Sequence, residues 1–149
     1  GARDFPELGH AVPGPGPRPG SEPEREGLFY RAVEFERRMP ALLAAADVIL
    51  CRAGASTVAE VATAGVPAVL VPLPNAPGDH QTANARALAD AGAAVVLPDS
   101  ECTPDRLEQI VGGLLGDREK RERMGAAGVA VARPGAADRV AALLEEHAR

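Results

Sequence analysis

The sequence has few aromatic residues and few cysteines. Aromatic residues make up 3% of the 149 residues and tryptophan is absent, so the core must consist mainly of Ala, Val and Leu. Two cysteines, Cys51 and Cys102, are too few for a disulfide framework or a zinc site. Cys51 ends an apolar run and is expected to be a small buried hydrophobic residue. We expect neither a metal nor a cofactor.

The sequence also lacks long apolar runs and basic clusters. No stretch approaches the roughly 18 apolar residues that span a membrane, and the N-terminus lacks the apolar region of a signal peptide. The net charge is −5 and the arginines are dispersed, whereas a nucleic-acid-binding protein needs a basic face. We therefore expect a soluble, cytoplasmic protein that does not bind nucleic acid.

The composition predicts one globular domain preceded by a loop. Hydrophobic residues make up 46% of the chain and charged residues 25%, which is typical of a folded domain. Residues 1–27 are rich in glycine, proline and charge and are predicted to form a flexible loop, whereas a regular pattern runs through 28–149. Because no structural element precedes this loop, the chain is expected to begin inside a larger protein.

Short aliphatic runs alternate with helical patterns after residue 28. Runs of continuous aliphatic residues that are separated by helices indicate strands of a parallel sheet covered on both faces. The prediction is therefore a doubly wound, Rossmann-like α/β layer, in which ligands bind beyond the carboxyl ends of the strands. The predicted strands are 28–33, 47–51, 67–72 and 94–97, and the predicted helices are 40–46, 56–64, 80–91, 104–115, 117–132 and 135–148.

The segment 51–60 is a strand end, a glycine-containing turn and a helix start. The backbone N–H groups and the positive dipole end of such a helix bind anions, commonly a phosphate, and Gly54 would let the ligand approach. Thr57 to Glu60 equally fits an S/T-x-x-E capping box, in which Glu60 serves the helix and not the ribose of a nucleotide. This segment alone leaves both interpretations open.

Two further clusters carry polar or flat side chains. Residues 79–84 could bond sugar hydroxyls at a helix start, or Asp79 could be a plain N-cap followed by a solvated turn. Phe35 and Met39 lie four residues apart, so they could flank a flat base, or form an ordinary core pair at helical spacing.

Four segments read together are more specific than any one of them. The sequence resembles the C-terminal, donor-binding domain of the MurG family of bacterial peptidoglycan transferases over about residues 28–148. Such GT-B glycosyltransferases transfer N-acetylglucosamine from UDP-GlcNAc to lipid I, giving lipid II. The segments that carry the resemblance are 33–39, 46–60, 64–72 and 79–85.

The resemblance implies a UDP-sugar site in residues 28–149, a domain of the glycosyltransferase family 28 C-terminal type. Phe35 and Met39 would line the uracil pocket, with the backbone of Glu36 on the base edge. The turn 54–57 would hold the diphosphate and Glu60 the ribose, while His80, Gln81 and Asn84 would lie at the sugar. The implied binding set is Phe35, Glu36, Met39, Arg52, Gly54, Ala55, Ser56, Thr57, Glu60, His80, Gln81 and Asn84.

The resemblance implies that the catalytic machinery of this family lies outside this sequence. Family members carry an N-terminal Rossmann domain with the proposed catalytic base, and the first strand of the C-terminal domain is also missing, so the sheet is expected to be incomplete at its N-terminal side. The chain alone is expected to be inactive. Lipid I and the inner face of the cell membrane, to which such enzymes bind peripherally, would be contacted through the missing half. Two alternatives remain: a non-catalytic nucleotide-sugar-binding subunit that needs a separate acceptor-domain partner, and an enzyme similar to UDP-GlcNAc 2-epimerase.

Overall fold

The computed structural model describes residues 35–148. The chain divides into two compact units, residues 1–37 and residues 38–149, and the fold below is that of the second unit. The predicted loop 1–27 and the predicted strand 28–33 lie outside the described residues.

The described strands form a parallel sheet in the order β1-β2-β3. They are β1 (Ile49–Cys51), β2 (Ala68–Leu70) and β3 (Ala94–Val96), which confirms the predicted strands with ends up to two residues shorter. Single hydrogen bonds continue the ladder beyond them, from Val71 N to the Cys51 carbonyl and from Leu97 N to the Leu70 carbonyl, each 2.9 Å long.

Each predicted helix is present, with its ends within two residues of the expected positions. Thr103 caps α4 by accepting a hydrogen bond from Arg106 N at 3.3 Å, and Gly65 ends α2 in the left-handed conformation with φ 66°. Two short 3₁₀ turns, η1 (Pro77–Asp79) and η2 (Asp99–Glu101), were not predicted. No described helix is both long and apolar enough to cross a bilayer. The helices are α1 (Met39–Ala45), α2 (Ala55–Ala64), α3 (His80–Asp90), α4 (Pro104–Gly116), α5 (Arg118–Val131) and α6 (Ala136–His147).

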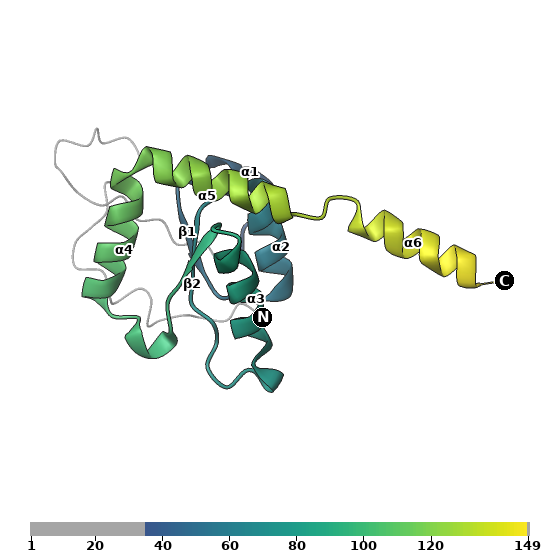
Figure 1. The fold of residues 1–149 in the computed structure, drawn as a ribbon, viewed down its shortest axis with the longest axis horizontal. Coiled ribbons are helices and arrows are strands. Elements are labelled where there is room, and N and C mark those ends of the chain that lie inside the picture. The colour runs from purple at the N-terminus through teal and green to yellow at the C-terminus, as the bar shows by residue number, and fades with distance from the viewer. Residues whose placement is uncertain (1–34, 149) are drawn as a thin grey trace. The chain divides into compact units, whose positions relative to one another are not determined.

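Apolar side chains fill both faces of the sheet, as expected for a doubly wound layer. Ala68 and Leu70 on β2 join a cluster with residues of α1, α2 and α3, whereas Val69 and Val71 pack with Leu114 of α4. Figure 1 shows α4 on one side of the strands and α2 and α3 on the other. Both faces of the sheet are covered by helices. In sheets of this kind, ligands generally bind beyond the carboxyl ends of the strands.

Helices α2 and α5 pack backbone against backbone through glycine. Gly125 is buried in α5, and a Cβ added there would overlap the carbonyl oxygen of Gly65 at the end of α2. One turn further along α5, a Cβ on Gly128 would lie 3.5 Å from the Ala62 carbonyl oxygen. Close contact between these helices therefore requires glycine at position 125.

Replacing Gly125 with alanine should destabilise the fold. Alanine favours an isolated helix by about 1 kcal/mol over glycine, but the overlap with the Gly65 backbone should reverse the sign and cost roughly 1–3 kcal/mol. Gly113→Ala in α4 is the matched control, because a Cβ there meets nothing within 4 Å. Urea unfolding followed by circular dichroism measures both variants. Equal or greater stability of Gly125→Ala than of the unsubstituted chain would contradict this packing.

Candidate functional site

The N-terminus of α2 lies at the carboxyl end of β1 and has no side-chain cap. Gly54 is the N-cap, and the first intrahelical bond runs from Val58 N to the Gly54 carbonyl at 2.9 Å. No side chain caps the helix, and within the described residues the N–H groups of Ala55, Ser56 and Thr57 have no acceptor. Uncapped N–H groups combined with the positive end of the helix dipole attract an anion.

The capping-box interpretation of Thr57 and Glu60 is wrong. A capping box needs the hydroxyl residue at the N-cap, but α2 begins at Ala55, which makes Thr57 its third residue. Glu60 therefore lies in the second turn, too far along the helix to bond the first N–H groups. Its carboxylate is exposed and has no partner within the described residues. Glu60 is thus available to a ligand.

No described residue requires glycine at position 54. Its φ of −63° and ψ of 148° are open to any residue, and a Cβ there would meet only the Thr57 hydroxyl, at 3.7 Å. The backbone conformation and the neighbouring atoms would therefore accept another residue at this position.

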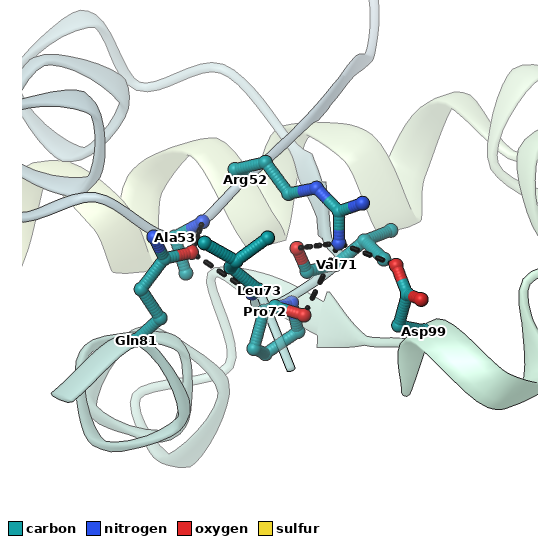
Figure 2. Close-up of polar contacts among 7 residues, drawn as sticks. All are labelled: Arg52, Ala53, Val71, Pro72, Leu73, Gln81 and Asp99. Atoms are coloured by element: carbon teal, nitrogen blue, oxygen red, sulfur yellow. Dashed lines mark hydrogen bonds and ion pairs between the residues drawn. The ribbon is translucent and has the colours of Figure 1, made fainter. Parts of the chain in front are cut away.

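Side chains of α3 hold the turn that leads into α2. The Gln81 Oε1 accepts hydrogen bonds from Ala53 N at 3.2 Å and from Leu73 N at 3.0 Å, as Figure 2 shows. The Asn84 Nδ2 donates to the Ala53 carbonyl at 3.1 Å. Because Ala53 is fully buried, both its backbone groups would lack water without these partners. Sequence reasoning assigned Gln81 and Asn84 to the sugar and missed this support of the backbone.

The start of α3 shows how His80 and Asp79 are bonded. His80 Nδ1 lies 2.6 Å from the Pro77 carbonyl oxygen, which can only accept, so Nδ1 carries the proton. Asp79 is the N-cap residue, as one interpretation expected, but it makes no side-chain bond to the helix backbone. Its carboxylate instead accepts the Thr82 hydroxyl at 2.6 Å.

The guanidinium of Arg52 bonds the protein itself. Its Nη1 donates to the carbonyls of Val71 and Pro72 at 3.3 and 3.2 Å, and forms an ion pair with Asp99 Oδ1 at 2.5 Å (Figure 2). Arg52 was predicted to bind substrate, whereas Asp99 was not singled out. The only sequence signal for Asp99 is that it follows β3 at the same edge of the sheet.

The predicted base-binding residues fall in different units. Phe35 and Glu36 belong to the unit 1–37, and Met39 begins α1 in the unit 38–149. Phe35 precedes the helix, so the assumed helical spacing of Phe35 and Met39 is wrong. The side chains are 78% and 39% exposed, which also excludes the alternative of a core pair.

The Cys51 thiol at the end of β1 is expected to be a poor nucleophile. Desolvation by burial raises the pKa of this thiol, so it stays protonated at neutral pH. It packs against the cluster that includes Leu70, although it is only partly buried. This agrees with the expected role as a small hydrophobic residue.

A parallel sheet with an open helix N-terminus at its carboxyl edge is the architecture of nucleotide-binding α/β proteins. Comparisons with known proteins narrow this class. Residues 18–140 match the glycosyltransferase family 28 C-terminal domain, and the chain belongs to this family.

Curated relatives and solved structures agree with the match. The chain is 48% identical to a protein of Solibacter usitatus over 84% of its own length, and 52% identical to one of Halorhodospira halophila over 76%. Both are named UDP-N-acetylglucosamine–N-acetylmuramyl-(pentapeptide) pyrophosphoryl-undecaprenol N-acetylglucosamine transferase. The chain covers 34% and 32% of these two relatives, about a third of their length.

The structural similarity is to glycosyltransferases. Acinetobacter baumannii MurG matches with a TM-score of 0.73 and 45% identity, over 78% of this chain and 33% of that one. The glycosyltransferase of kitacinnamycin matches with a TM-score of 0.58 and 31% identity, over 73% and 27%. The expected GT-B fold and the resemblance to the MurG family are therefore confirmed.

Substitutions of Gln81 should show whether its side chain supports the backbone of Ala53 and Leu73. Gln81→Ala leaves the N–H groups of Ala53 and Leu73 without an acceptor and should lower the free energy of unfolding by about 1–3 kcal/mol. Gln81→Glu keeps an acceptor oxygen and should stay near the unsubstituted chain, although it loses the amide donor. Urea unfolding measures both. Full stability of Gln81→Ala would show that these bonds do not support the turn.

Proposed function

We propose that this chain is the donor-binding part of an inverting glycosyltransferase, which transfers N-acetylglucosamine from UDP-GlcNAc to lipid I to form lipid II in peptidoglycan synthesis. The observation that carries the proposal is the uncapped N-terminus of α2 behind Gly54, in a chain of this family. The transferase names of its relatives supply the donor and the reaction.

The diphosphate of the donor would bind at the start of α2. The N–H groups of Ala55, Ser56 and Thr57 are unbonded within the described residues and can donate to its oxygens, and the hydroxyls of Ser56 and Thr57 can add bonds. Negative charge grows on the UDP leaving group as the sugar is transferred. Donors that are already oriented stabilise that charge without reorganisation, which lowers the barrier. The same N–H and hydroxyl groups would therefore bind the donor and stabilise UDP as the leaving group.

The remaining predicted residues would bind the nucleoside and the sugar of the donor. Glu60 would accept bonds from the ribose hydroxyls, and its lack of a partner in the described structure supports this role. Met39, at the N-terminus of α1, would line the uracil pocket. Near the sugar, the Gln81 amide group and the Asn84 carbonyl oxygen are unbonded in the described structure, and both could contact hydroxyl groups of N-acetylglucosamine, as could His80.

Acceptor binding and catalysis would belong to other parts of the protein. We assign no catalytic residue to this chain, which spans about a third of the length of the relatives it matches. Lipid I, the catalytic base and attachment to the inner face of the cell membrane would involve the remainder. The chain by itself would bind the donor and transfer nothing.

Glu60→Ala should weaken binding of UDP-GlcNAc about tenfold or more, since a hydrogen bond to a charged group is worth roughly 1.5–3 kcal/mol. The free energy of unfolding should change little, because the exposed Glu60 side chain forms no hydrogen bond or ion pair with a described residue. Isothermal titration calorimetry of the 149-residue chain gives the affinity. Glu108→Ala on α4 is the matched control, since it removes the same charge from another exposed carboxylate. Equal binding by the two variants would refute the ribose role.

A further inference from the structure

Arg52 connects the carboxyl ends of the strands in the described sheet. It follows β1 directly, Val71 and Pro72 follow β2, and Asp99 lies in η2 after β3. One nitrogen of Arg52, Nη1, reaches acceptors in both of the other segments: the carbonyls of Val71 and Pro72, and the Asp99 carboxylate (Figure 2). We call these four residues the Arg52 cluster.

The Arg52 cluster provides hydrogen bonds to β2 beyond the point where the β-ladder ends. Leu97 N donates to the Leu70 carbonyl, and the chain then turns into η2, so within the described residues β3 gives no donor to the next carbonyl that faces it, that of Pro72. The Val71 carbonyl faces β1, because Val71 N donates to the Cys51 carbonyl, and its expected donor, Ala53 N, bonds Gln81 instead. Both carbonyls belong to buried residues and accept hydrogen bonds from the Arg52 guanidinium. Arg52 therefore replaces a strand donor at the edge of the sheet where the ligand is proposed to bind.

The cluster is also one residue away from the turn before α2. Ala53 is bonded from the other side by Gln81 and Asn84, so the backbone of 52–53 is held by α3 on one side and by the Arg52 cluster on the other. The direction of the free N–H groups at 55–57 follows from the position of this turn.

We propose that Asp99 is a positioning residue of the donor site. Its carboxylate fixes the Arg52 guanidinium across the strand ends, and this fixes the turn 52–54 and the N–H groups that follow it. The predicted effect of Asp99 on nucleotide binding rests on the proposed function. Its predicted effect on the turn 52–54 rests only on the hydrogen bonds of the Arg52 cluster.

Because the ion pair is exposed, we expect Asp99 to orient the Arg52 guanidinium and to add little to the stability of the fold. The side chains of Arg52 and Asp99 are 50% and 39% exposed, and an ion pair so open to water adds little to the free energy of folding. Loss of Asp99 should therefore leave the unfolding temperature unchanged and loosen only the adjacent turn. A merely structural ion pair would show no such local effect.

The test compares Asp99→Ala with Glu101→Ala, which removes the same charge from an exposed side chain of the same 3₁₀ turn. Amide hydrogen exchange of the free 149-residue chain should speed up about two- to fivefold at Ala53, the effect that an exposed ion pair can have. Leu97 in the sheet and the control should not change. UDP should bind Asp99→Ala more weakly by a similar factor, and Asp99→Asn, which keeps an acceptor oxygen, should be intermediate.

Three results bear on the proposal in different ways. Unchanged exchange at Ala53 in Asp99→Ala would overturn it. Tighter binding of UDP by Asp99→Ala would also overturn it, because Asp99 would then compete with the diphosphate for Arg52. Failure of the unsubstituted chain to bind UDP would overturn the proposed function, and the exchange of Ala53 would still decide the role of Asp99.

Discussion

The backbone of Ala53 is bonded at both its N–H and its carbonyl by side chains of α3, and the site depends on this constraint. Gln81 and Asn84 fix a buried residue that immediately precedes the N-cap of α2. Because the turn is held, α2 starts at Ala55 and points its free N–H groups beyond the edge of the sheet. Gln81 also bonds Leu73, so the loop after β2 is held by the same oxygen atom.

The fold follows from local patterns that survive in the structure. Short aliphatic strands such as Val69–Leu70 are buried on both faces, and this alone implies a parallel sheet between two layers of helices. Proline after Thr103 and glycine after Ala64 mark helix ends through their own backbone preferences. These signals require no knowledge of distant residues, which is why the predicted elements agree with the structure.

The site was less predictable, because its bonds join residues far apart in the sequence. Arg52 and Asp99 are separated by 47 positions, and Gln81 and Ala53 by 28. The residue types suggested ligand contacts and gave no sign of the backbone groups that they bond. The capping box failed for a local reason: the N-cap of α2 is Gly54, three residues before Thr57, and glycine has no side chain to cap the helix.

The central claim is that the N–H groups at the start of α2 bind the diphosphate of a UDP-sugar. Nuclear magnetic resonance tests it directly by following the amides of a ¹⁵N-labelled chain during titration with UDP-GlcNAc, UDP or uridine. The account predicts large shifts of Ala55, Ser56 and Thr57 with both phosphate-bearing ligands and none with uridine. Saturating binding of UDP-GlcNAc that leaves these three amides unmoved would contradict it.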